Sequence, residues 1–377
     1  MKIGLLLPYT GIDTAQGTDV TNGFELYLAM AGRSTGTCDI EIIKEDDEAK
    51  PEVALMRLKK LVEADRVDFL VGPISSAVVL AIRHYVRECG VPLVVPAAFT
   101  RVLTAPNEAA PNIFRLSETS DQANYPMGSW IMEHTPYRNI IVMAADFAGG
   151  RHSVEAFMAG FRAAGGKIAA EIYPPFGNSD FGPALRQAAA FDADAVYAWF
   201  AGADAVHFLT QYKDYGLDRT LPLTGHSALT SDTILPVIGK AALGIITTGS
   251  YSATVDTQDN HQFVRDYEAA YNSRPSRYSE CGWVAAALIT TAVHDLNGAL
   301  SDPARTRAAL KTALAKIRPP RGSMEFDRYG QAITPIYITR TEEQFGRVIN
   351  VVIDTLPAVT QERTWGWWNR TSQDAAK

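Results

Sequence analysis

The sequence predicts an α/β protein with two lobes, each a doubly wound parallel sheet covered by helices on both faces. Short runs that are apolar throughout, such as residues 3–8 and 69–71, are typical of parallel strands buried on both faces. Amphipathic helical runs alternate with these strands from the first residue. The alternation restarts near residue 121, and 377 residues give enough length for two cores.

The first lobe begins with a strand at residues 3–8 and a Gly-containing loop at 10–18. Apolar residues at helical spacing predict a helix from about Asp19, and Pro51 stands where proline opens a helix. Gly72 and Pro73 form a tight turn between a strand and a helix that starts near Ser76. The remaining strands are expected at residues 40–44, 92–96 and 113–116.

The second lobe repeats this plan from residue 121. Helices are expected at 125–134, 153–164, 181–191 and 204–215, and strands at 139–144, 168–173, 195–200, 221–224 and 244–247. Three helical runs (260–272, 280–297, 303–316) and two strand-like runs (332–339, 346–353) follow. The aromatic segment 365–370 is interpreted as a buried anchor on the second lobe.

Composition excludes several classes of function. A net charge of −7 and a pI near 5.6 argue against a nucleic-acid partner. No apolar run approaches the roughly 18–20 residues that span a bilayer. The first residues predict a strand rather than a secretory signal, so the protein is either cytoplasmic or an export signal has been removed. Cys38, Cys89 and Cys281 form no Cys-x-x-Cys pair, and a Cys38–Cys89 disulfide stays open.

No complete catalytic or cofactor-binding motif occurs in the sequence, so we expect neither an enzyme nor a bound cofactor or metal. The seven histidines lack the spacing of a zinc helix, and neither a dinucleotide fingerprint nor a P-loop is present. The stretch from Gly225 to Leu229 half-matches a nucleophile elbow, but Leu229 replaces the second glycine. A hydrolase that uses Ser227 and His226 therefore remains an alternative to ligand binding by closure of a cleft.

The turn at residues 71–76 has the chemistry of a carboxylate site. Ser75 and Ser76 stand at a predicted helix N-terminus, where free N–H groups and the helix dipole favour an anion. The alternative is a capped strand–helix junction with no ligand.

Several stretches, in order along nearly the whole chain, resemble the type I periplasmic solute-binding proteins of ABC importers, and above all the Leu/Ile/Val-binding branch. The stretches are residues 3–11, the helix around Gly23, Glu45-Asp46-Asp47, residues 71–76, residues 94–98 and the late Phe326-Asp327 with Tyr329-Gly330. The resemblance implies three chain crossings, near residues 118–121, 247–251 and 327–331. Lobe one would then be 1–119 plus 250–328, and lobe two 120–249 plus 329–377. It also implies export, in which case a signal peptide would have been removed from this sequence.

The resemblance further implies which residues hold the ligand carboxylate. They would be Ser76 of the serine pair, beside Ser75, together with Ala97, Phe99 and Thr100 after the fourth strand. Neutral donors at a helix terminus suit a carboxylate. For Thr100, a loop cap is the alternative.

Two departures from the resembled family change the expected ligand. Ser227 stands where amino-acid binders place an acidic partner for the ammonium, and the family's Tyr-Gly becomes Phe147-Ala148-Gly149-Gly150. An unpaired buried ammonium costs several kcal/mol. Standard amino acids are therefore disfavoured as ligands. Aromatic side chains would instead form the walls around a flat ring, and those expected to face the ligand are Phe99, Phe147, Phe200 and Tyr278, with Gly149, His226 and Gln16 beside them. Core packing is the alternative for Phe147 and Phe200, and a satisfied loop residue for His226.

The sequence thus predicts a monomeric periplasmic binding protein that closes on a small aromatic carboxylate, such as a benzoate or a phenylpropanoid acid, and delivers it to an ABC permease. A branched-chain amino acid or a small amide is the first alternative ligand. A cytoplasmic ligand sensor of the same fold is the alternative in another class.

Overall fold

The computed structural model describes residues 1–11, 13–32 and 39–364, which form two compact units. Unit 1 comprises residues 1–118 and 255–335, and unit 2 comprises residues 119–254 and 336–377. Cys38 and the aromatic segment 365–370 lie outside the described residues, so the Cys38–Cys89 disulfide that the sequence leaves open is not described. Within the described part of the chain, no helix has both the length and the apolar composition needed to cross a bilayer.

Unit 1 is built on a five-stranded parallel sheet in the order β2-β1-β3-β4-β5. Its strands are β1 (Lys2–Leu7), β2 (Glu41–Asp46), β3 (Phe69–Val71), β4 (Leu93–Val95) and β5 (Ile113–Arg115). Its helices are α1 (Thr14–Ala31), α2 (Pro51–Lys59), η1 (Lys60–Ala64), α3 (Ser76–Cys89), η2 (Arg101–Thr104), α9 (Gln258–Tyr271), α10 (Arg277–Asp295) and α11 (Pro303–Ala313).

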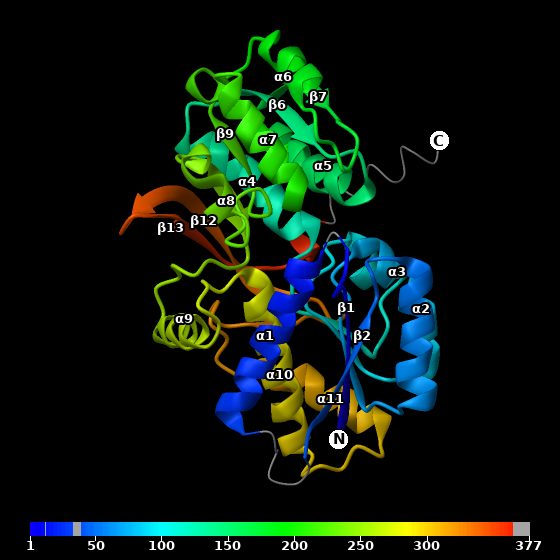
Figure 1. The fold of residues 1–377 in the computed structure, drawn as a ribbon. Coiled ribbons are helices and arrows are strands. Elements are labelled where there is room, and N and C mark those ends of the chain that lie inside the picture. Colours follow the sequence, from blue (N-terminus) through cyan, green and yellow to red (C-terminus); the bar gives the residue numbers. More distant parts are fainter. Residues whose placement is uncertain (12, 33–38, 365–377) are drawn as a thin grey trace. The chain divides into compact units, whose positions relative to one another are not determined.

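Side-chain alternation along β1 divides the core of unit 1 into two layers. Leu5 and Leu7 pack in one layer with α1 and α10, whereas Leu6 packs in the other with α2 and α3. Figure 1 shows these helix pairs on opposite sides of the sheet. The close approach of α1 and α10 requires glycine, because a Cβ on Gly23 would lie 1.7 Å from the carbonyl oxygen of Ser279. The late helices thus return to the first sheet, as the sequence predicts.

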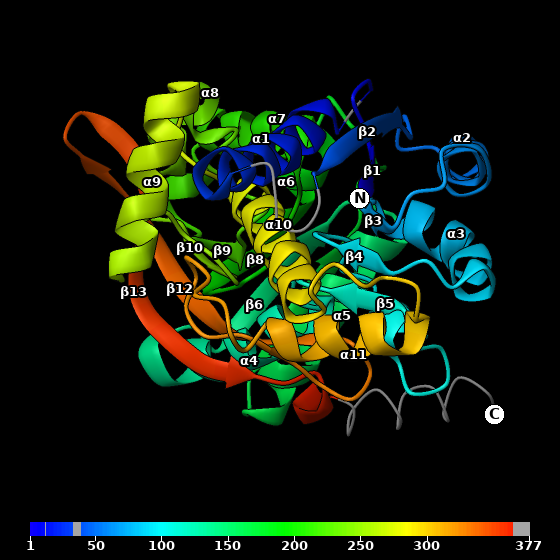
Figure 2. The same ribbon diagram turned by 90° about the horizontal axis from the view of Figure 1, so that it is seen from below.

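Unit 2 repeats this strand order and extends it. Its parallel strands run β7-β6-β8-β9-β10, and antiparallel β12 and β13 are added beyond β10 (Figure 2). The strands are β6 (Asn139–Ala144), β7 (Lys167–Ile172), β8 (Ala195–Trp199), β9 (Leu223–His226), β10 (Ile246–Gly249), β12 (Ala332–Gln344) and β13 (Arg347–Val359). The helices are α4 (Ser120–His134), α5 (Ala148–Ala163), α6 (Gly182–Ala189), α7 (Gly202–Asp214), η3 (Leu217–Arg219), α8 (Leu235–Ile238) and η4 (Gly239–Ala242).

The helices of unit 2 also form two layers. Ile140 and Val142 of β6 pack with α4 and α5, whereas Ile141 and Met143 pack with α6 and α7. The α/β class and the two doubly wound parallel sheets predicted from the sequence are therefore confirmed.

The structure divides the chain at 118/119, 254/255 and 335/336, whereas the family resemblance implied boundaries at 119/120, 249/250 and 328/329. The largest difference, at the third crossing, has a simple cause. Strand β12 is continuous: Ala332 and Ile333 pair with β11 (Glu325–Phe326) in unit 1, and residues 337–340 pair with β10 in unit 2. The strand rather than the preceding turn therefore carries the crossing.

Candidate ligand-binding site

The carboxyl edge of the unit 1 sheet collects most of the residues predicted to hold a carboxylate. The turn after β3 carries Ser75 and Ser76, and the segment after β4 carries Ala97, Phe99 and Thr100. Because β3 and β4 pair in parallel, these two segments leave the sheet side by side. Ligands of open α/β sheets bind at this edge.

The two serines of the turn have different roles. Ser75 is the N-cap of α3, and its Oγ accepts a hydrogen bond from the Val78 amide at 3.5 Å. Ser76 is the first residue of α3, and its Oγ accepts from the Thr100 amide at 3.2 Å. Ser76 therefore connects the two segments while its hydroxyl proton stays available to donate. The turn requires Gly72, whose φ of +125° disfavours side chains and whose Cβ would meet the Leu6 carbonyl at 2.0 Å.

Thr100 caps η2, since its Oγ1 accepts from the Val102 amide at 3.4 Å. The loop-cap alternative is thus present in the structure, and it leaves the hydroxyl proton to donate elsewhere. Ala97 is buried beside it in the unit 1 core, and Phe99 is half-buried.

Arg115, at the end of β5, fixes this segment, and it was not among the residues predicted from the sequence. Its guanidinium donates to the carbonyl oxygens of Ala98 at 2.8 Å and Thr100 at 2.5 Å, and to Thr104 Oγ1 at 2.6 Å. Its Nε donates to Gln331 Oε1. The side chain is fully buried. A single arginine inside the apolar run 113–116 was the only sequence signal.

Arg277 of unit 1 lies beside Phe99 and contacts two further side chains of the same unit. The Arg277 guanidinium lies 4.1 Å from the centre of the Phe99 ring and 4.8 Å from that of Tyr278. Arg277 Nη1 also contacts Glu118 Oε1 at 3.4 Å. Burial raises the pKa of the Tyr278 hydroxyl, so Tyr278 is a neutral donor. The structure therefore joins the predicted Phe99 and Tyr278 through an arginine that was not among the predicted site residues.

Gln16, predicted in the first loop, lies in the first turn of α1, because that helix begins earlier than expected. It is 9 % exposed, and its Oε1 has no hydrogen-bond partner among the described residues. An amide oxygen in that position is able to accept a hydrogen bond from a ligand.

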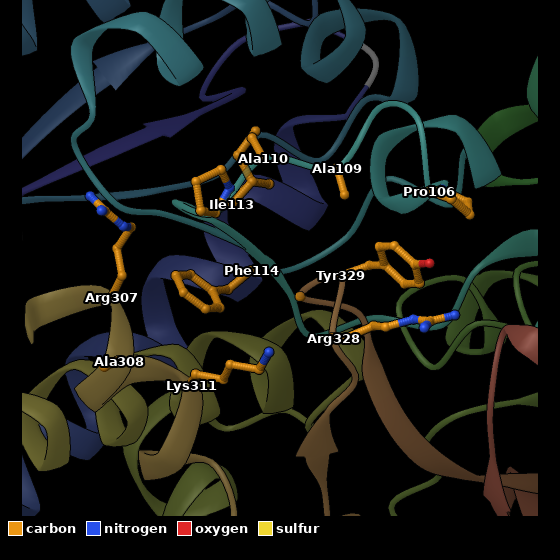
Figure 3. Close-up of a pocket in the computed structure, with 12 residues that line it drawn as sticks. Pro106, Ala109, Ala110, Ile113, Phe114, Arg307, Ala308, Lys311, Arg328 and Tyr329 are labelled. Carbon is orange, nitrogen blue, oxygen red and sulfur yellow. The ribbon is translucent and has the colours of Figure 1, made fainter. Parts of the chain in front are cut away.

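A separate pocket of about 410 Å³ lies elsewhere in unit 1, and none of the predicted site residues lines it (Figure 3). Phe114, Lys311 and Tyr329 contribute to its wall, and Arg307 and Arg328 extend toward opposite sides. The arginine charges do not converge on one point, so we do not assign this pocket to the site.

The carboxyl edge of the unit 2 sheet is aromatic. Phe147 follows β6 as the N-cap residue of α5, and Gly149 lies in the first turn of that helix. A Cβ on Gly149 would lie 2.7 Å from the Phe147 ring, so glycine leaves room for this ring position. The Phe147 ring centre is 5.4 Å from that of Trp199, at the end of β8. Trp199 was missed because it reads as an ordinary apolar strand residue.

Phe200, by contrast, is fully buried in the core of unit 2. Its ring packs edge-on against Phe181, with ring centres 5.1 Å apart, and at a tilt against Phe208, with ring centres 4.5 Å apart. The structure therefore places Phe200 away from the edge and favours the core-packing alternative for it, because the preceding Trp199 takes the alternate side of the strand.

His226 ends β9 on the same edge, and Ser227 follows directly after the strand. His226 is 1 % exposed, its ring centre lies 6.4 Å from that of Trp199, and its Nδ1 accepts from the Ala228 amide at 3.1 Å. The accepting Nδ1 places the ring proton on Nε2. Ser227 Oγ is a buried atom with no hydrogen-bond partner in the described part of the chain.

This geometry does not assemble the hydrolase alternative. Activation of a serine needs a hydrogen bond between its hydroxyl and a base, and Ser227 Oγ has no such bond to His226 among the described residues. No group of three or more His, Cys, Asp or Glu side chains able to hold a metal occurs within residues 1–11, 13–32 and 39–364.

Comparison with known proteins agrees with this architecture. The model of a family described as periplasmic binding protein matches residues 1–345. A Leu/Ile/Val-binding protein homologue of Brucella melitensis is 26 % identical over 338 residues, covering 89 % of this chain and 85 % of its own.

Two solved structures share the fold over nearly their whole length. An ABC transporter substrate-binding protein from Sphaerobacter thermophilus has a TM-score of 0.90 and 32 % identity, over 95 % of this chain and 98 % of its own. An ABC transporter solute-binding protein from R. palustris, in complex with benzoate, has a TM-score of 0.88 and 30 % identity, over 96 % and 98 %. This chain belongs to the periplasmic binding protein family, among the substrate-binding proteins of ABC transporters.

Proposed function

We propose that this protein binds a small aromatic carboxylate, of the benzoate or phenylpropanoid type, for an ABC importer. Two observations, one in each unit, carry the proposal. Unit 1 presents the Ser76 and Thr100 hydroxyls at the edge of its sheet, and unit 2 presents the Phe147 and Trp199 rings together with Ser227, which stands where the resemblance implies an ammonium partner. The similar R. palustris protein in complex with benzoate supports it.

In unit 1, the ligand carboxylate would accept hydrogen bonds from the Ser76 and Thr100 hydroxyls. Each oxygen already accepts a backbone amide, so its proton is oriented away from that amide. The N-terminus of α3 adds a favourable field for the negative charge.

In unit 2, the aromatic ring of the ligand would pack against Phe147 and Trp199. Offset or edge contacts between aromatic rings contribute about 0.5–1.5 kcal/mol each beyond burial. The His226 imidazole lies next to Trp199 and suits a polar ring substituent such as a hydroxyl.

A branched-chain amino acid is the second candidate, because the curated relatives are named as Leu/Ile/Val-binding proteins. Such a ligand brings an ammonium, and the neutral Ser227 and His226 give it no carboxylate at this edge. Burying an unpaired ammonium costs several kcal/mol. We therefore favour the aromatic acid.

We further propose that the protein acts in the periplasm as a monomer without enzymatic activity and delivers its ligand to the membrane permease of the importer. Family membership supports this assignment.

The test is calorimetric titration with benzoate of the wild-type protein and two hydroxyl deletions. Ser76→Ala removes a hydrogen bond to a charged group, worth about 1.5–3 kcal/mol, so we expect affinity to fall about 10- to 100-fold. Thr257→Ala is the matched control, since Thr257 caps α9 in the same unit and lies outside the site. Equal affinity of Ser76→Ala and Thr257→Ala would contradict the carboxylate assignment.

A further inference from the structure

We infer that Arg277 is a specificity-determining residue of the unit 1 half-site: it supplies positive charge to the ligand carboxylate, and Glu118 limits how much of that charge the ligand feels. This inference rests on the proposed function and deepens it. Hydroxyl donors alone do not distinguish an acid from a neutral amide, so the preference for an acid needs a positive charge.

The position of Arg277 is well defined. It is the first residue of α10, where Ser276 and Ser279 form a capping box. Its guanidinium lies over the Phe99 ring and beside the Tyr278 ring, two of the predicted ligand residues. Phe99 precedes Thr100, whose amide binds Ser76, so Arg277 packs on the segment that carries the proposed carboxylate donors.

The bonding of Arg277 is incomplete. The residue is 5 % exposed, yet its buried Nε has no hydrogen-bond partner among the described residues. Its contact with Glu118 is a single one at 3.4 Å, which is long for a charge-assisted hydrogen bond. A guanidinium carries five N–H donors, so this contact leaves capacity for another anion.

A second buried ion pair in unit 1 shows what a purely structural arginine looks like. Arg321 is fully buried, and its Nε donates to Glu280 Oε2 at 2.8 Å. Its Nη2 donates to the same oxygen and contacts Cys281 Sγ at 2.8 Å. Arg321 is thus held by several short contacts, whereas Arg277 is held by one long contact and by two aromatic faces.

These features suit an arginine whose N–H donors become fully hydrogen-bonded only when an anionic ligand binds. Stacking on Phe99 and Tyr278 keeps the plane of the guanidinium fixed without using its N–H donors. A carboxylate is the anion whose two oxygens match that fork of donors. Glu118, which is fully buried and ends the first segment of unit 1, keeps the site neutral when it is empty and competes with the ligand.

The test compares benzoate with benzamide, a neutral ligand of nearly the same size, by titration calorimetry. The proteins are the wild type, Arg277→Met, Glu118→Gln and the double variant. We expect Arg277→Met to weaken benzoate at least tenfold and benzamide less than threefold. Glu118→Gln removes the competing anion and should strengthen benzoate severalfold without changing benzamide. Arg277→Lys should retain most of the preference for the acid.

Two controls keep the outcomes separate. Lys311→Met removes one positive charge at the other unit 1 pocket, which tests for a long-range charge effect and should leave the benzoate-to-benzamide ratio unchanged. The double variant keeps the buried charges balanced, so it folds if the single loss of Arg277 does not, and it should lose the preference for benzoate. An unchanged ratio in Arg277→Met or in the double variant overturns the inference alone. A wild-type protein that binds no aromatic acid overturns the proposed function and this inference with it.

Discussion

The two units share one strand order but present different chemistry at their carboxyl edges. The order β2-β1-β3-β4-β5 in unit 1 corresponds to β7-β6-β8-β9-β10 in unit 2. The unit 1 edge is polar and connected by hydrogen bonds, such as those of Ser76 and Arg115. The unit 2 edge is connected by ring contacts around Trp199. The shared fold therefore fixes where ligand residues stand, and the side chains decide what they bind.

The difference also predicts how each edge responds to substitution. A substitution at the hydrogen-bonded edge of unit 1 removes a whole hydrogen bond to the ligand, and the loss of affinity is large if the ligand is charged. Ring contacts lose graded packing area, and the loss is smaller for each group.

The largest expected effect comes from placing an acid in the aromatic edge. Ser227→Asp adds a carboxylate where Ser227 Oγ now has no partner among the described residues. An uncompensated buried charge costs about 3–5 kcal/mol, so benzoate affinity should fall at least 100-fold. Leucine, whose ammonium would pair with the new acid, should gain affinity. Calorimetric titration with benzoate and with leucine measures both changes in affinity.

Ser227→Asn is the matched control, because it has a similar size and no charge. We expect it to lose less than tenfold in benzoate affinity. An equal loss in Ser227→Asp and Ser227→Asn would show that size rather than charge governs this position.

An intermediate effect concerns how stability depends on pH, because two acids near the sheet edges have pKa values shifted in opposite directions. Asp47, near the end of β2 in unit 1, is 0 % exposed, and burial raises the pKa of its carboxyl to about 6. Exposed Asp146, near the end of β6 in unit 2, accepts a hydrogen bond from Arg151 Nε at 2.6 Å, and that bond lowers its pKa.

Because its pKa is raised in the folded state, Asp47 lowers the stability of the fold as pH rises. The unfolded carboxyl loses its proton near pH 4 and the folded one near pH 6, so the carboxyl destabilises the fold increasingly across that range. Asp47→Asn keeps an oxygen to accept the Ala49 amide at 2.8 Å. Relative to the wild type, its free energy of unfolding should rise by about 1–3 kcal/mol from pH 4 to pH 7. Urea unfolding at both pH values measures this, and a difference that stays constant would contradict it.

The smallest expected effect separates ligand packing from core packing in unit 2. Phe147→Leu removes a half-buried ring at the edge and should weaken benzoate by about 0.5–1.5 kcal/mol, or two- to tenfold. Phe208→Leu removes a fully buried core ring and should lower the free energy of unfolding by about 1 kcal/mol with affinity unchanged. Titration and thermal unfolding of both variants measure the split, and a reversed pattern would place Phe147 in the core.

The fold followed from the sequence because its signals are local. Apolar strands such as β1 and amphipathic helices such as α3 are specified by nearby residues. The start of α1 was missed because the loop before it ends without a side-chain cap, so Gln16 was placed in a loop. The third crossing was expected near residues 327–331, and it lies a few residues later because one strand pairs with both units, which no local signal reveals.

The site was predictable only in part, for a related reason. Ser76 and Thr100 follow separate strands, and their hydrogen bond depends on β3 and β4 being neighbours. Arg277 is about 180 residues further along the chain than Phe99, so its stacking depends on the return of the chain to unit 1. Trp199 and Phe200 are adjacent and both aromatic, and only the side alternation along β8 decides which one is buried in the core.

The most direct measurement is calorimetric titration of the wild-type protein with benzoate and, separately, with leucine. The polar edge of unit 1 and the aromatic edge of unit 2, with Ser227 rather than an acid after β9, predict saturable binding of benzoate and at least 100-fold weaker binding of leucine. Tighter binding of leucine than of benzoate would contradict the account, because an ammonium would then be stabilised at an edge where Ser227 and His226 provide no negative charge.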